Sequence, residues 1–198
     1  MNETMESRGV RLSVRTFVFA FALLLASAGF LAAGWWLRPI ADAQQAVRDG
    51  RLQQALASYG VAEKRFASMP LAKRFLPNLY DLIVTNELST LYTLKQYDEV
   101  IDKAGATGTR GSHFWAGCAL FAIGDLAFLT PDKRMKWLSE AQEEFRRAVE
   151  NSPSDFDAKF NYEVTAKVIV GVKKARPPRP TDLNLLRPSN VQTPKRVG

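Results

Sequence analysis

The chain is poor in the residues from which metal and disulfide sites are built. Its 198 residues include one Cys and one His. A disulfide needs two cysteines, and a structural zinc site needs four ligands that are mostly Cys or His. The sequence therefore excludes an internal disulfide, argues against structural zinc, and predicts no bound metal and no cofactor.

Conventional catalytic pairs are equally scarce. His113 and Cys118 lie five residues apart in a helical stretch, where their side chains diverge by roughly 100° or more, which is poor geometry for a nucleophile and its base. The glycine-rich run GATGTRGS (residues 105–112) lacks the Gly-Lys-Ser/Thr ending of a phosphate loop. We predict no catalytic residues and no enzymatic activity. A hydrolase with an unrecognised site is the alternative.

The central part of the chain carries no net positive charge. The net charge is +7, but residues 17–170 carry equal numbers of acidic and basic groups, and residues 171–198 carry seven basic groups against Asp182. A nucleic-acid surface needs its excess charge on a folded face. The sequence therefore predicts no nucleic-acid partner.

Residues 174–198 form a basic, proline-rich tail. The stretch after Arg176 contains five of the ten prolines and no aromatic residue, so it cannot bury enough apolar surface to fold by itself. We expect a disordered tail. Its short apolar island could dock on a partner protein, or the tail could simply remain solvated; the island consists of Leu183, Leu185 and Leu186.

A charge-free run of 21 residues, 17–37, lies near the N-terminus. As a helix it would be about 31 Å long, the thickness of a bilayer's hydrocarbon core. Three arginines precede the run, which favours a cytoplasmic segment 1–16, and Trp35 and Trp36 end it where a membrane interface would lie. The sequence predicts a single-pass membrane helix with an exported domain.

A cleaved signal peptide is the competing interpretation of the same run. Ala26-Ser27-Ala28 provides a small-residue cleavage site. The apolar run continues nine residues past Ala28, whereas a mature chain would become polar there. A membrane anchor is therefore favoured.

Residues 38–173 have the apolar periodicity of helices throughout. Apolar residues recur at spacings of three and four, and glycine and proline punctuate the segment into pairs. Thr130-Pro131-Asp132 marks a helix start, and Ser154 with Asp157 has the spacing of a capping box. We expect seven helices, over residues 39–48, 51–67, 78–94, 97–104, 112–129, 131–150 and 155–173.

The paired helices carry the spacing of a tetratricopeptide repeat. Ala141, Phe145, Ala148 and Pro153 match the small–bulky–small–proline pattern of that repeat's second helix. Ala55, Tyr59 and Ala62 match the same pattern more weakly in an earlier repeat, and Val100 belongs to a weak match in another repeat. The predicted fold class is all-α: an N-terminal transmembrane helix followed by about three degenerate tetratricopeptide-like hairpins and a capping helix. An ordinary helical bundle is the alternative.

The run AQEEFRRAVENSPSDFDAKFNYEVTAKVI (residues 141–169) resembles the last repeat of a group of membrane-anchored proteins. These are the MxaK-like tetratricopeptide proteins found with MoxR-type ATPases and von Willebrand A-domain proteins. The resemblance implies a bacterial inner-membrane protein with a periplasmic domain that assists maturation of a periplasmic or membrane enzyme, of the methanol-oxidation type. A stable non-catalytic accessory subunit is the alternative.

Stacked hairpins expose a concave surface that receives peptide segments. In the repeat register, Asn86 and Asn161 occupy equivalent positions, where an Asn could hold a peptide backbone or tie neighbouring helices together. We expect partner proteins to bind this groove, with a further contact possible through the tail and lipid contact through residues 17–37. The predicted groove residues are Asn86, Ser89, Tyr92, Phe160, Asn161 and Lys167.

Overall fold

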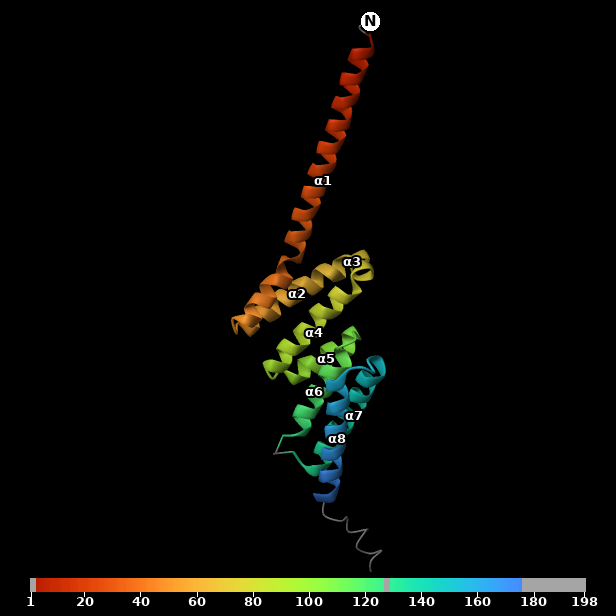
Figure 1. The fold of residues 1–198 in the computed structure, drawn as a ribbon. Coiled ribbons are helices and arrows are strands. Elements are labelled where there is room, and N and C mark those ends of the chain that lie inside the picture. Colours follow the sequence, from red (N-terminus) through yellow and green to blue (C-terminus); the bar gives the residue numbers. More distant parts are fainter. Residues whose placement is uncertain (1–2, 127–128, 176–198) are drawn as a thin grey trace, which may run out of the picture. The chain divides into compact units, whose positions relative to one another are not determined.

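The computed structural model describes residues 3–126 and 129–175, with side chains from residue 16 onward. Within those ranges every regular element is a helix and no strand occurs, which confirms the all-α prediction. The predicted tail contact at Leu183, Leu185 and Leu186 lies outside the described residues. The helices are α1 (Glu3–Arg48), α2 (Leu52–Ser68), α3 (Pro70–Phe75), α4 (Pro77–Thr93), α5 (Tyr97–Thr107), α6 (Ser112–Gly124), α7 (Pro131–Asn151) and α8 (Phe156–Ala175) (Figure 1).

The chain forms two compact units, divided after Gln96. In the first unit, α1 packs on α2, and α2 packs on α4. In the second unit each helix from α5 to α8 packs on the next one along the chain. Within each unit, helices that follow one another along the chain are therefore neighbours in space, as in a repeat architecture.

The residues that carry the repeat pattern form the cores of these units. Ala55, Tyr59 and Ala62 on α2 are each at most 2% exposed. On α7, Ala141 and Phe145 are at most 1% exposed, and Phe145 packs with Leu120 of α6 in one apolar cluster. The alanines permit close helix approach, and the Phe145 ring fills the space between α6 and α7.

The two hairpin turns of the first unit have the same backbone geometry. At the turn after α1, Gly50 has φ +72° and its amide donates to the Val47 carbonyl at 3.0 Å. At the turn after α4, Lys95 has φ +60° and its amide donates to the Tyr92 carbonyl at 2.9 Å. Left-handed residues end helices in this way. Helices α1 and α4 therefore end in the same way.

Several predicted helix boundaries were wrong. The connection expected near Pro70 contains the short helix α3, and the helix expected to reach residue 129 ends at Gly124. The predicted start at Pro131 is confirmed: the Thr130 hydroxyl accepts a hydrogen bond from the Lys133 amide at 3.4 Å. The last helix is capped by Asp155, whose carboxylate accepts from the Ala158 amide at 3.1 Å, and not by Ser154.

The apolar run and the first expected helix, 39–48, form one continuous helix, α1, although Pro39 lies inside it. Proline has no amide hydrogen, so the Trp35 carbonyl loses its usual partner four residues on. The Arg65 guanidinium of α2 replaces that partner: it donates to the carbonyls of Trp35 at 2.8 Å and Trp36 at 2.7 Å. In Figure 1 the orange end of α1, against which α2 packs, runs in a different direction from the long red part.

Aromatic contacts reinforce this junction. The guanidinium carbon of Arg65 lies 4.5 Å from the centre of the Trp35 ring. The Trp36 and Phe66 rings lie 4.7 Å apart, and Phe66 in turn lies 5.9 Å from Tyr80 of α4. The end of the apolar run is thus packed directly on the first unit, with no free linker between them.

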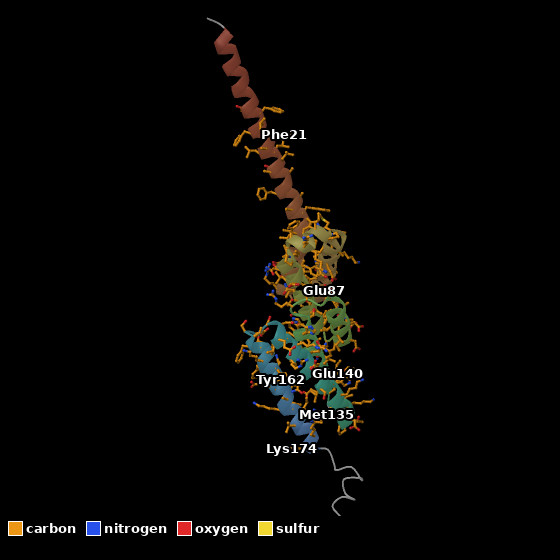
Figure 2. The ribbon with its side chains drawn as sticks, turned by 90° about the vertical axis from the view of Figure 1, so that its right-hand side faces the viewer. Phe21, Glu87, Met135, Glu140, Tyr162 and Lys174 are labelled. Atoms are coloured by element: carbon orange, nitrogen blue, oxygen red, sulfur yellow. The ribbon has the colours of Figure 1, made fainter. Side chains whose placement is uncertain are left out.

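From residue 16 to residue 35 every side chain of α1 is exposed. Phe21 is 54% exposed and Phe30 81% exposed, and Figure 2 shows Phe21 projecting from a helix that stands alone. The helix is long and apolar enough to cross a membrane. Its exposed side chains distinguish it from the core helix of a soluble domain, whose side chains are buried.

Gly117 of α6 lies directly against the ring of Phe145. A Cβ at this position would lie 2.8 Å from Phe145 Cδ1. We predict that Gly117→Ala lowers the free energy of unfolding by about 1–3 kcal/mol through overpacking, measured by chemical denaturation.

Gly171→Ala is the matched control in the same unit. An added Cβ there meets nothing within 4 Å, so the better helix propensity of Ala should raise stability by up to about 1 kcal/mol. Equal effects of the two substitutions would contradict the close packing of α6 on α7.

Candidate functional site

A groove opens between the end of α1 and α4, with α2 beneath it. It encloses about 270 Å³. Both of its walls belong to helices that pack on α2. The residues that line it are Gln44, Val47 and Arg48 from α1, Tyr59 from α2, and Asn86, Ser89 and Thr90 from α4.

Tyr59 forms the floor of the groove. Its side chain is 2% exposed, and its hydroxyl is hydrogen-bonded to the side chain of Asn86. Burial raises the pKa of Tyr59, and the bond to Asn86 opposes that shift. The floor therefore carries a neutral phenol at physiological pH. The carboxamide of Asn86 has two donor hydrogens and an acceptor oxygen, so one bond to Tyr59 does not exhaust its capacity.

The rim of the groove beside α1 is positively charged. Arg48 is held at the helix end by a hydrogen bond from its Nη2 to Gln45 Oε1 at 2.7 Å. Next to it, Val47 is 39% exposed. The lining thus combines amide and hydroxyl groups, one cation and one apolar side chain, and it contains no acidic residue. Such a surface suits an extended polypeptide that carries a carboxylate.

Of the predicted groove residues, Asn86 and Ser89 line this groove. Tyr92 lies further along α4, half-buried and outside the lining. The other three belong to α8 in the second unit. Phe160 is 55% exposed and stacks on Phe156 with ring centres 6.3 Å apart. The Asn161 side chain donates to the Asp157 carbonyl of its own helix at 2.9 Å, and Lys167 is exposed.

Asn86 and Asn161 nevertheless have matching local structure. A threonine follows each of them by four residues, and its hydroxyl donates to the Asn carbonyl at 2.7 Å in both helices. Both threonines, Thr90 and Thr165, are buried. The same bond joins Thr93 to the Ser89 carbonyl and Thr107 to the Lys103 carbonyl, so it is a general feature of threonine in these helices. Sequence reasoning missed Gln44, Val47 and Arg48, because the helix that bears them shows no repeat signature.

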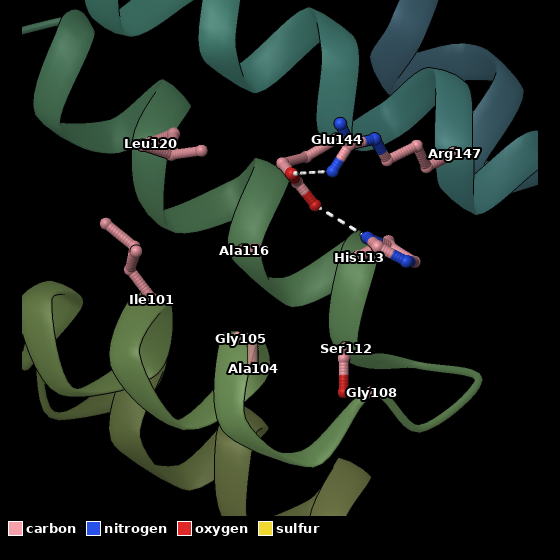
Figure 3. A pocket seen from close by; sticks show the side chains of 10 residues that line it. All are labelled: Ile101, Ala104, Gly105, Gly108, Ser112, His113, Ala116, Leu120, Glu144 and Arg147. Carbon is pink, nitrogen blue, oxygen red and sulfur yellow. Dashed lines mark hydrogen bonds and ion pairs between the residues drawn. The ribbon is translucent and has the colours of Figure 1, made fainter.

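A second cavity, of about 280 Å³, lies among α5, α6 and α7 (Figure 3). His113 Nδ1 lies 2.7 Å from Glu144 Oε2, and Arg147 donates to Glu144 Oε1 at 3.2 Å. In Figure 3 the Ser112 side chain points toward the loop at Gly108, away from this cluster. The rest of the lining is small or apolar and includes Ile101, Ala104, Ala116 and Leu120.

The hydroxyl of Ser112 forms its hydrogen bonds within that loop. It accepts a hydrogen bond from the Thr109 amide at 3.0 Å, and it lies 2.7 Å from the Thr109 hydroxyl. Ser112 is 1% exposed. It therefore closes the turn between α5 and α6, and His113, which faces Glu144, is not positioned to activate it.

Cys118 packs against the apolar cluster of Leu120, Ala141 and Phe145. Burial, together with the carboxylate of Asp157, raises the pKa of Cys118 to about 12. At neutral pH the thiol is therefore protonated, and only the thiolate is a good nucleophile. We therefore expect Cys118 to be as unreactive as other buried cysteines.

We predict that Cys118 in the native protein reacts with iodoacetamide at pH 7.5 far more slowly than free cysteine does. Unfolding in denaturant should restore the ordinary rate, because both the burial and the Asp157 contact are then lost. Mass spectrometry of the alkylated protein measures this. Rapid native alkylation would show that the thiol is activated.

Comparison of the sequence with protein-family models and with curated proteins finds no match. Among solved structures, the chain is similar to the first TPR domain of the human RPAP3 protein, determined by NMR. The TM-score is 0.52 at 16% identity, and the match covers 72% of this chain and 98% of that domain. The fold is therefore tetratricopeptide-like, as the spacing around Phe145 predicted.

Proposed function

We propose that this protein is a membrane-anchored scaffold of the bacterial cell envelope, which binds a segment of a partner protein in the groove between α1 and α4. The observation that carries the proposal is the groove itself. It lies between two helices of a tetratricopeptide-like fold, a class of fold that binds peptide segments on its concave side, and amide, hydroxyl and cationic groups converge on it. The resemblance of residues 141–169 to MxaK-like proteins suggests an assembly or maturation role for an enzyme of the methanol-oxidation type.

Exposure of the apolar run supports the anchor. Phe17 is 72% exposed and Leu31 is 77% exposed, and residues of this kind are stable only when lipid or protein covers them. Trp35, at the end of the run, is 67% exposed, which suits the aromatic belt of a membrane interface. With the Arg-rich segment 1–16 in the cytoplasm, the domain would face the periplasm of the inner membrane.

The lining of the groove indicates how a partner would bind. An extended backbone offers amide and carbonyl groups, for which Asn86 and Gln44 are suitable partners. Arg48 would pair with an acidic side chain of the same segment, since the lining contains no carboxylate and the neighbouring Asp49 is already hydrogen-bonded to Gln45 and Arg51. Val47 would contact an apolar neighbour. No step of this binding requires catalysis, a metal or a cofactor.

A photo-crosslinking amino acid at position 47 tests the groove in native membranes. We expect discrete adducts in which mass spectrometry identifies one recurring segment of one partner. Val61 is the matched control, since it is another valine of the first unit, 46% exposed against 39% for Val47, and it does not line the groove.

Arg48→Gln should reduce the adduct formed from position 47 several-fold, because the partner's carboxylate loses its ion pair. Asn86→Ala should do the same, provided that circular dichroism shows the fold intact. Equal adducts from positions 47 and 61, or adducts indifferent to both substitutions, would refute the groove. Recovery of the partner as a fixed stoichiometric complex in mild detergent would favour the accessory-subunit alternative over a transient assembly factor.

A further inference from the structure

The segment formed by α3 and its flanking residues leaves large apolar side chains uncovered. No residue of α3 is buried. Leu71 and Phe75 are 66% and 75% exposed. They are four residues apart and so lie on one face of the helix. Met69 before α3 and Leu76 after it are 49% and 44% exposed.

The charge of this segment has a single sign. Residues 64–76 contain Lys64, Arg65, Lys73 and Arg74 and no acidic residue. The Lys73 amine lies 4.2 Å from the centre of the Tyr80 ring, so its side chain also holds α3 on α4. An exposed apolar face among cations is the composition of a helix that lies in a membrane surface.

The junction with α1 places this segment beside the end of the apolar run. Arg65 is bound to the carbonyls of Trp35 and Trp36, and α3 begins five residues later, at Pro70. Five residues span at most about 18 Å even when fully extended. In Figures 1 and 2 the yellow part of the first unit lies on the side from which the long part of α1 emerges.

We propose that α3 with Met69 and Leu76 is a second membrane contact, which rests in the interface of the same bilayer that α1 crosses. Leu71 and Phe75 enter the boundary between headgroups and acyl chains, and Lys64 and Arg74 contact lipid phosphates. A bilayer is favoured over a partner protein as the occupant because a span that ends at Trp35 and Trp36 places the membrane surface at this level. This inference rests on the proposed anchor.

Spin labels in the full chain test the contact. The chain is reconstituted at one copy per lipid nanodisc, with equal parts of phosphatidylethanolamine and phosphatidylglycerol. Labels are attached one at a time in a Cys118→Ser background, at Leu71→Cys or Phe75→Cys. Leu24→Cys serves as the control within the bilayer and Val61→Cys as the control in water. Accessibility to oxygen relative to a water-soluble nickel chelate reports depth.

We expect the oxygen-to-nickel ratio at positions 71 and 75 to exceed that at position 61 several-fold and to remain below that at position 24. Arg74→Gln should lower the ratio at position 75, because a phosphate contact is lost. Ratios at 71 and 75 equal to that at 61, with 24 still deep, would overturn the α3 contact and leave the anchor intact. A water-exposed label at position 24 would overturn the anchor itself.

Protection of positions 71 and 75 that requires other proteins or a second copy would also overturn the proposal. In that case the labels at positions 71 and 75 would be exposed to water in single-copy nanodiscs. They would be buried in native membranes, or in vesicles that hold several copies of the chain. The surface would then be a protein interface.

Discussion

Pro39 breaks the hydrogen-bond ladder of α1 at the point where the apolar run meets the folded unit, and Arg65 repairs it. A backbone carbonyl without a partner costs free energy when it is removed from water. The guanidinium has enough donors to serve the Trp35 and Trp36 carbonyls together. Together with the packing of Trp36 on Phe66, this contact joins the end of the apolar run to α2.

That junction connects the two surfaces to which we assign function. The end of α1 beyond Pro39 supplies one wall of the groove through Gln44, Val47 and Arg48, so the groove is attached to the proposed membrane helix without an intervening linker. After α2, the chain reaches α3, for which we propose a second membrane contact. A partner held in the groove would therefore be held at a defined height above the bilayer, which suits a factor that assists a membrane or periplasmic enzyme.

The sequence was sufficient for the features that depend on local pattern. The spacing of Ala141, Phe145 and Ala148 predicted a tetratricopeptide-like repeat, and Thr130-Pro131 predicted the start of α7, because both signals arise from neighbouring residues. Continuity through Pro39 could not be predicted, because the compensating donor, Arg65, comes from another helix. Two residues of the groove lining, Asn86 and Ser89, were among those expected from the repeat register, whereas Gln44, Val47 and Arg48 of α1 carry no repeat pattern from which the sequence could predict them.

A double-mutant cycle between Pro39 and Arg65 tests this junction most directly, with free energies of unfolding measured in detergent by denaturant titration. Arg65→Met should cost about 1.5–3 kcal/mol, the range for hydrogen bonds to charged groups. In a Pro39→Ala background the restored amide of residue 39 bonds to the Trp35 carbonyl, so the same substitution should cost clearly less. Arg51, which pairs with Asp49 at the surface, is the control and should show no coupling to Pro39. An equal cost of Arg65→Met in both backgrounds would contradict the account.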